Sequence, residues 1–303
     1  LKKKNLMKIT VWGGSGFLGS YICDALSDIG HEIIIADIHE SVWKRDDQQM
    51  LIGNIMDQDT VAESVENADY VFNFAGIADI DDANVEPQNS AEINILGNLN
   101  LLTACKNAKV KRYIFASSLY VYSNSGGFYR CSKQACEGYI DEYHRQYGLQ
   151  FTVLRFSSLY GLRADSKNTI CRFIRDALTK KKISYHGSPD ALREYIHGED
   201  AARICCEILD DRFSNQHLTI TGHQTMRVGN LINMIGEILG EKIDHEFNTQ
   251  ARSFHYEITP YTFNPKLGLK YSPEFQIDMG AGLLEIMDAM HKEINENKKH
   301  TLP

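Results

Sequence analysis

The sequence has no run of apolar residues long enough to span a membrane, because its longest runs, near residues 33–36 and 70–75, are only as long as strands. It also has no excess of positive charge: 32 lysines and arginines are outnumbered by 40 aspartates and glutamates, and the formal net charge is −8. This balance argues against nucleic acid or an anionic membrane surface as the main partner. Any anionic ligand is therefore expected to be held by a few local groups.

The cysteines offer no sign of a disulfide framework or a zinc knuckle. There are seven, an odd number, and none forms a Cys-x-x-Cys pair. We therefore expect a cytoplasmic protein without a bound metal. Lysines 2–4 are not followed by an apolar region of signal-peptide length, so a solvated end is expected there.

Short β-rich segments alternate with helical patterns, which is typical of an α/β fold with a doubly wound parallel sheet of the Rossmann type. The strands expected are residues 8–12, 32–37, 49–52, 70–74, 112–116 and 151–155. The helices expected between them are residues 19–29, 60–67, 91–106 and 132–147. The rhythm changes after residue 161, where helices are expected near residues 169–179, 199–209, 228–239 and 282–294. No Pro/Gly/Ser-rich linker marks a boundary, so we expect a smaller, interleaved C-terminal lobe.

A glycine-rich loop, residues 13–19, follows the first strand and leads into a helix. Gly13 permits the turn, Gly16 leaves room for a pyrophosphate, and Gly19 lets the helix pack closely on the strand. The free N–H groups and positive dipole end of the helix would then meet the phosphates. This order of strand, loop and helix predicts a dinucleotide-binding domain over residues 1–160, to which later segments return, and a mainly substrate-binding lobe over residues 161–303.

Asp37 ends the next strand, eighteen residues beyond Gly19. A carboxylate there would accept hydrogen bonds from both ribose hydroxyls and repel a 2′-phosphate, so NAD is favoured over NADP. Lys44 and Arg45 could serve a 2′-phosphate, but a solvated loop explains them better.

A group suited to proton transfer follows. Tyr129 and Lys133 are four residues apart at the start of an expected helix, and so share one face. A cation beside a phenol, joined by the positive nicotinamide ring, is expected to lower the pKa of the phenol, so that Tyr129 can accept a hydroxyl proton. Ser118, at the end of the strand before it, could hold the substrate oxygen. Three other tyrosines lack a lysine at this offset and are interpreted as packing residues: Tyr120, Tyr122 and Tyr139.

Eight segments together resemble the extended short-chain dehydrogenases/reductases, in particular the NAD-dependent nucleotide-sugar epimerase/dehydratase family to which UDP-glucose 4-epimerase belongs. They are residues 13–19, 37, 73–76, 94–100, 117–122, 129–133, 154–161 and 193–200. The resemblance covers nearly the whole chain and implies a homodimer paired through the helices 91–106 and 132–147.

The resemblance also implies roles for individual residues. The cofactor site would comprise Gly13, Ser15, Gly16, Phe17, Leu18, Gly19, Asp37, Asn54, Ile55, Ala75, Gly76 and Asn94, with Tyr129 and Lys133. Asn94 would also support the active-site helix. The substrate would meet Ser118, Ser158, Arg193 and Arg252, of which Arg193 would bind the diphosphate of a nucleotide-diphosphate sugar and Arg252 would be a second ligand.

The sequence departs from the family at several positions. Asn54 stands where an aspartate is usual, Ser158 replaces an asparagine, and the segment from Ser118 to Tyr129 is short. Family dehydratases carry an Asp-Glu pair where this chain has Leu119 and Tyr120, so dehydration is disfavoured. Oxidation at C4 remains, and the residues do not separate a nucleotide-sugar 4-epimerase from a 4-dehydrogenase that releases a 4-keto sugar. We expect the 4-epimerase, because the resemblance is to a family in which that reaction is the more frequent. A non-catalytic NAD-binding sensor or scaffold is a third possibility, against which the intact Tyr, Lys and Ser set argues.

Overall fold

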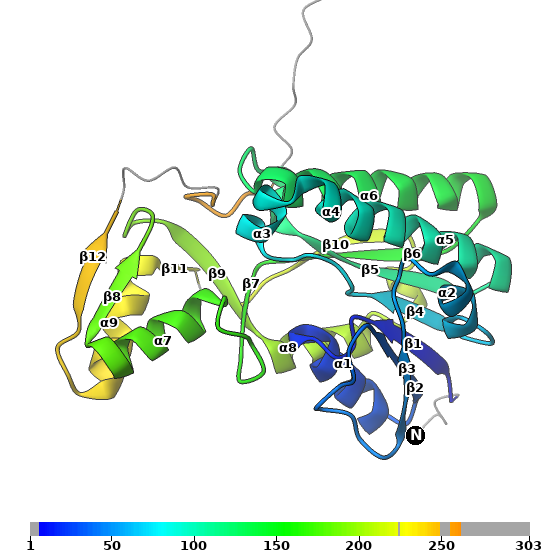
Figure 1. The fold of residues 1–303 in the computed structure, drawn as a ribbon, viewed down its shortest axis with the longest axis horizontal. Coiled ribbons are helices and arrows are strands. Elements are labelled where there is room, and N and C mark those ends of the chain that lie inside the picture. Colours follow the sequence, from blue (N-terminus) through cyan, green and yellow to red (C-terminus); the bar gives the residue numbers. More distant parts are fainter. Residues whose placement is uncertain (1–5, 224, 249–254, 262–303) are drawn as a thin grey trace, which may run out of the picture. The chain divides into compact units, whose positions relative to one another are not determined.

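The computed structural model describes residues 6–223, 225–248 and 255–261. Its centre is a seven-stranded sheet in which every neighbouring pair is parallel (Figure 1). The strands, in spatial order, are β10 (Gln216–Ile220), β6 (Phe151–Phe156), β5 (Arg112–Ser118), β4 (Tyr70–Asn73), β1 (Lys8–Trp12), β2 (Glu32–Asp37) and β3 (Gln48–Ile52). The order reverses between β1 and β4, which is the switch point where doubly wound sheets bind ligands at the carboxyl ends of their strands.

Both faces of the sheet are covered, which explains why its central strands β1 and β4 are mostly apolar and buried. Along β1, Ile9 and Val11 enter the core beneath α1 (Phe17–Asp28) and α8 (Gly198–Glu207), and these two helices pack on each other. Trp12 enters the core on the other face. The helices of that second face are α2 (Gln58–Ser64), α5 (Gly97–Ala108) and α6 (Gly127–Tyr147).

Short elements connect β4 to α5 and β5 to α6. They are α3 (Ile80–Val85), α4 (Pro87–Ala91), the π-helical turn η1 (Glu92–Leu96) and the 3₁₀ turn η2 (Leu119–Tyr122). A further 3₁₀ turn, η3 (Asp211–Phe213), precedes β10. The elements α3, α4, η1 and η2 all contact α6, the helix that carries the candidate catalytic residues.

The prediction of six strands was one short. β10 pairs with β6 and extends the sheet, although it comes from the part of the chain after residue 161. Its residues Gln216 and His217 give it no apolar run, because β10 is the edge strand and only Ile220 is buried. Two segments from after residue 161 therefore pack with the first domain: strand β10 and helix α8.

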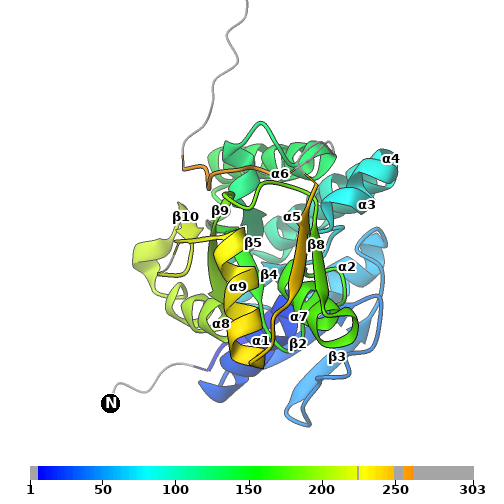
Figure 2. The same ribbon diagram turned by 90° about the vertical axis from the view of Figure 1, so that its left-hand side faces the viewer.

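The remaining elements form a smaller core of their own (Figures 1 and 2). Helices α7 (Thr169–Lys180) and α9 (Val228–Leu239) contact each other, and β8 (Lys182–Tyr185) pairs with β12 (Asp244–Phe247). A three-stranded sheet places β9 (Leu192–His197) between β7 (Ser158–Tyr160) and β11 (Thr225–Arg227). The predicted helix 282–294 lies outside the described residues.

In the part of the chain that the structure describes, no helix combines the length and the apolar character that a membrane span requires. Within the same ranges, His, Cys, Asp and Glu side chains do not gather in a group of three or more that could hold a metal ion.

Candidate active site

The glycine loop has the geometry that its sequence predicts. Gly13 has a φ of +77°, which other residues rarely adopt. A Cβ at Gly19 would lie 2.1 Å from the carbonyl oxygen of Gly13, so only glycine lets α1 approach the turn. Gly16 is the N-cap of α1 and has no side chain to satisfy the amides of the first turn, which includes Phe17 and Leu18. Those amides are therefore available to an anion.

Asp37 lies beside this loop, as predicted. Its carboxylate accepts hydrogen bonds from the backbone N–H of Ser15 at 3.0 Å and of His39 at 3.3 Å. The Ser15 hydroxyl donates to the His39 carbonyl at 2.7 Å. These hydrogen bonds join the end of β2 to the phosphate loop.

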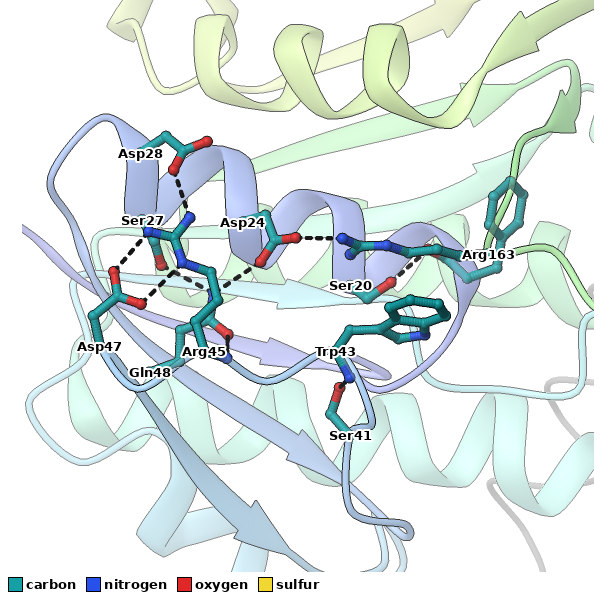
Figure 3. Close-up of polar contacts among 11 residues, drawn as sticks. Ser20, Asp24, Ser27, Asp28, Ser41, Trp43, Arg45, Asp47, Gln48 and Arg163 are labelled. Carbon is teal, nitrogen blue, oxygen red and sulfur yellow. Dashed lines mark hydrogen bonds and ion pairs between the residues drawn. The ribbon is translucent and has the colours of Figure 1, made fainter.

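The loop after β2 is held by ion pairs (Figure 3). Arg45 forms ion pairs with Asp28 at 2.5 Å and with Asp47 at 3.0 Å. Its charge is therefore already paired with carboxylates of the protein, which fits its interpretation as part of a surface loop. From the loop after β7, Arg163 pairs with Asp24 of α1 at 2.6 Å, and its guanidinium lies 4.7 Å from the Trp43 ring centroid. The contacts of Arg163 with Asp24 and Trp43 could not be predicted from the sequence, because Arg163 is more than a hundred residues from both.

The far wall of the predicted cofactor site is built around Asn94, in the π-helical turn η1. Its Oδ1 accepts a hydrogen bond from the backbone N–H of Ile77 at 2.7 Å, and Ile77 directly follows Ala75 and Gly76 in the chain. Its Nδ2 donates to the Ser132 hydroxyl of α6 at 3.0 Å. Asn94 therefore joins the loop after β4 to the active-site helix, as the resemblance implied. π-Helical turns often occur at functional sites.

Two further predicted cofactor residues follow β3. Asn54 is exposed, and its Oδ1 accepts the N–H of Met56 at 2.9 Å. Ile55 is buried against Gly97 at the start of α5. The structure thus places Asn54 at the surface and Ile55 in the core beneath it.

Ser118, Tyr129 and Lys133 come together at the carboxyl end of β5. Ser118 is the last residue of that strand, and its hydrogen bond with Tyr129 lowers the pKa of the phenol. The Lys133 ammonium lies 5.7 Å from the centroid of the Tyr129 ring and donates to the carbonyl of Ala116 at 2.7 Å. The three side chains are positioned by one strand end and one helix face.

Burial opposes the lowering of the Tyr129 pKa that the sequence predicts from Lys133 and a nicotinamide ring, and that lowering stays a prediction. Burial raises the pKa of Tyr129 to about 12, and the hydrogen bond with Ser118 offsets only part of this rise. Burial also lowers the pKa of Lys133, whose ammonium is directed to the Ala116 carbonyl. The four-residue spacing correctly places the Lys133 ammonium near Tyr129. The largest effect on the pKa of Tyr129 is nevertheless its burial, because a buried phenolate loses its contact with water.

A buried ionic network lies directly behind this group. Glu137, one helical turn after Lys133, accepts from the Ser117 hydroxyl at 2.5 Å and from two nitrogens of Arg155 at 2.6 and 3.0 Å. His217 of β10 lies 3.5 Å from the same carboxylate. Burial acts to raise the pKa of Glu137, but these hydrogen bonds outweigh it and the pKa is lowered. The network fixes the end of β5 against α6.

Tyr120 belongs to a second cluster, which the sequence did not predict. Its ring lies 6.3 Å from that of Tyr129 and 4.7 Å from that of Tyr256, and its hydroxyl is 2.6 Å from Nδ1 of His255. The interpretation of Tyr120 as a packing residue was therefore incomplete, since its hydroxyl has a specific partner. Burial raises the pKa of Tyr120 and lowers that of His255, so both are neutral near pH 7.

Two of the predicted substrate residues join this cluster. The buried Arg193 has its guanidinium 4.5 Å from the Tyr256 ring, and its Nη1 donates to the carbonyls of Leu192 and Glu257 at 3.0 and 3.3 Å. Burial raises the pKa of Tyr256, and a hydrogen bond with Ser158 offsets part of this rise. Arg252, the other predicted ligand, lies outside the described residues.

These features define an enzyme site built on a dinucleotide-binding fold: a glycine loop, an acidic strand end and a tyrosine, lysine and serine group at one edge of the sheet. The model of the NAD dependent epimerase/dehydratase family matches residues 9–221. The chain belongs to this family of nucleotide-sugar enzymes, and it is an NAD-dependent enzyme.

The proteins that this chain resembles carry the names of different reactions. A putative UDP-glucose 4-epimerase of Methanocaldococcus jannaschii is 25% identical over 93% of this chain and 98% of its own length. A dTDP-glucose 4,6-dehydratase of Mycolicibacterium smegmatis is 23% identical over 93% of this chain and 92% of its own length. Among solved structures, UDP-N-acetylglucosamine 4-epimerase from Methanobrevibacter ruminantium, in complex with UDP-N-acetylmuramic acid, is 26% identical with a TM-score of 0.77, covering 86% of this chain and 90% of that one. The fold class, family and cofactor predicted from the sequence are confirmed, whereas the residue roles stay predictions.

Proposed function

We propose that this chain is a UDP-sugar 4-epimerase that oxidises its substrate at C4 and reduces it again on the other face. The observation that carries the proposal is the convergence of Ser118, Tyr129 and Lys133 beside Leu119 and Tyr120, where the family's dehydratases have an acid and a base. Leu119 is fully buried and aliphatic. Tyr120 has a raised pKa and stays a neutral phenol. Neither supplies the carboxylate chemistry that removal of water needs.

In this proposal Tyr129 accepts the proton of the C4 hydroxyl, while Ser118 donates a hydrogen bond to the same oxygen. NAD, when bound, supplies the hydride acceptor and a positive nicotinamide ring. The raised pKa of Tyr129 means that the phenol holds its proton until positive charge arrives nearby. Lys133 contributes part of that charge and is fixed by the Ala116 carbonyl.

Arg193 is proposed to bind the substrate diphosphate. A guanidinium has five N–H donors, and the two bonds to Leu192 and Glu257 involve one nitrogen, Nη1. Those bonds and the Tyr256 ring fix the plane of the guanidinium, which favours recognition of a phosphate group. The UDP-linked substrates of the 4-epimerases named above support a UDP sugar.

The proposal is tested by incubating the protein with NAD and, separately, UDP-glucose, UDP-N-acetylglucosamine, UDP-glucuronic acid and dTDP-glucose. We expect a product of unchanged mass whose proton NMR spectrum shows inversion at C4. Loss of two hydrogens with accumulation of NADH would identify the 4-dehydrogenase instead. Loss of water would show that another acid and base serve the site. Binding of NAD without turnover of any of these sugars would favour the sensor or scaffold.

We also propose a homodimer formed through α5 and α6. Large side chains are exposed at Tyr139 (44%) and Tyr147 (59%) of α6, and at Leu96 (47%) just before α5. Sedimentation at micromolar concentration is expected to show a dimer, and a monomer would contradict this. A cytoplasmic location stays a prediction.

A further inference from the structure

The active-site helix α6 begins without a capping side chain of its own. Its N-cap is Gly126, with a φ of +97°, and its first residue is Gly127, with a φ of +51°. The amides of a first helical turn need acceptors from outside the helix. Tyr129 lies only two residues after Gly127, so any movement of this first turn moves the phenol.

Asn84, from the neighbouring helix α3, supplies one of the missing acceptors. Its Oδ1 accepts the backbone N–H of Phe128, the residue before Tyr129, at 3.2 Å. Asn84 also lies directly against Gly127, where a Cβ would be 2.1 Å from the same oxygen. Gly127 is therefore required both by its left-handed φ and by the space that Asn84 occupies.

Helix α3 is held firmly enough to carry this contact. The Asp79 carboxylate caps it by accepting the N–H groups of Asp81 and Asp82 at 2.9 Å each. Asp82 also forms an ion pair with Lys167, in the loop before α7. Helix α3 therefore has a cap and an ion pair of its own in addition to its packing on α6.

The orientation of the Asn84 amide points to its oxygen as the working atom. In the described part of the chain, the buried Nδ2 has no hydrogen-bond partner. The opposite orientation would direct two donors, Nδ2–H and the Phe128 N–H, at each other. The orientation with Oδ1 toward the Phe128 N–H leaves Nδ2 unpaired but avoids this opposition of two donors.

We propose that Asn84 is a positioning residue for the proposed catalytic Tyr129: it caps α6 from a different helix and so fixes the phenol relative to Ser118. The inference rests on the function proposed above for Tyr129. The short connection between Ser118 and Gly127 explains the arrangement. Its Ser123 side chain is used within the turn, accepting the N–H of Ser125 at 2.9 Å. The capping acceptor therefore comes from α3.

The test compares Asn84→Ala, which removes the acceptor, with Asn84→Asp, which keeps an acceptor and adds negative charge at a helix N-terminus. Asn89→Ala is the matched control, because Asn89 is exposed on the adjacent helix α4. Hydrogen exchange is measured over residues 126–135, together with kcat, KM and the pH dependence of kcat.

We expect Asn84→Ala to exchange the Phe128 amide faster and to lower kcat by roughly tenfold or more, since a small misplacement of reacting groups has effects of this size. KM should change by less than about threefold, because the substrate-binding cluster around Arg193 is untouched. The limb of the pH profile that reports Tyr129 should shift. Asn84→Asp and Asn89→Ala should both resemble the wild type.

Unchanged exchange and kcat in Asn84→Ala would overturn the proposal. So would an Asn84→Asp variant as impaired as Asn84→Ala, since that would implicate Nδ2. If the wild-type protein converts no nucleotide sugar, the proposed function fails, and hydrogen exchange alone still decides whether Asn84 caps α6.

Discussion

The cofactor half and the substrate half of this site are built in different ways. The phosphate loop is a single strand, loop and helix, and Asp37 reaches it from the next strand with a bond to Ser15 only 22 residues away. In the substrate half, Tyr120 meets His255 across 135 residues, and Arg193 meets Glu257 across 64. Local spacing therefore determines the first half, whereas tertiary packing determines the second. Tyr129 lies where the two halves meet.

Tyr129→Phe should have the largest effect, because it removes the proton acceptor on which both halves depend. We expect kcat to fall by roughly 10²–10⁴-fold, the usual contribution of a general base, with NAD affinity unchanged. Steady-state kinetics and NAD titration measure the two separately. Tyr139→Phe, which removes only the hydroxyl of an exposed tyrosine on the same helix and keeps its ring for the proposed dimer contact, is the control and should leave kcat and NAD affinity unchanged. A Tyr129→Phe enzyme with near-normal turnover would remove Tyr129 from the mechanism.

Glu137→Leu should have the next largest effect, on stability. It leaves the buried Arg155 without its carboxylate and releases Ser117, next to Ser118. Breaking a buried pair from one side lowers the free energy of unfolding by about 3–5 kcal/mol. Denaturant titration measures this loss. Glu142→Leu, which removes an exposed carboxylate of the same helix, should barely change the midpoint, and equal losses in the two variants would contradict a structural role for the network.

Asp37→Ala tests the cofactor half alone. Loss of the carboxylate removes a partner for the ribose hydroxyls and a repulsion against a 2′-phosphate. We expect NAD affinity to fall by about tenfold relative to NADP affinity, which corresponds to about 1.4 kcal/mol. Asp46→Ala, at an exposed position of the following loop, should leave the ratio unchanged. A preference for NAD that survives in Asp37→Ala would place ribose recognition elsewhere.

The smallest effect concerns His217, whose pKa is raised by hydrogen bonding to Glu137, with Asp141 adding to the rise. Because the folded pKa lies above the unfolded value, the stabilisation is fully present below about pH 6.5 and is lost as pH rises through the folded pKa. The stability difference between wild type and His217→Gln should therefore be larger at about pH 6 than at about pH 9. The third charged neighbour, the Arg155 guanidinium, opposes protonation of His217, but the net pKa of His217 is still raised, so the sign is kept. A difference that grows with pH would contradict this assignment.

The sequence was sufficient where a role depends on residues close together in the chain. Gly13 and Asp37 lie in the predicted loop and strand, and Lys133 lies on the predicted helix, because glycine turns and helical spacing have fixed geometric consequences. Tyr129 precedes the expected start of that helix at residue 132, but α6 begins at Gly127 and so includes it. β10 was missed because an edge strand needs no apolar run.

Energetic balances and long-range contacts could not be derived in the same way. The raised pKa of Tyr129 depends on how completely the fold buries it, which spacing does not report. His255 and Asn84 carry no motif, and each matters only because packing brings it to Tyr120 or Phe128. Arg193 was found through resemblance alone, since nothing in its own neighbourhood distinguishes it from a surface arginine.

Hydride transfer at C4 is tested most directly with a UDP sugar that carries deuterium at that carbon. The label should pass to the cofactor and back, so that the epimerised product keeps its deuterium at C4 and its full mass. Tyr129→Phe should leave the substrate unchanged. Exchange of the C4 label with solvent, or a product lighter by one water, would contradict an NAD-dependent epimerase.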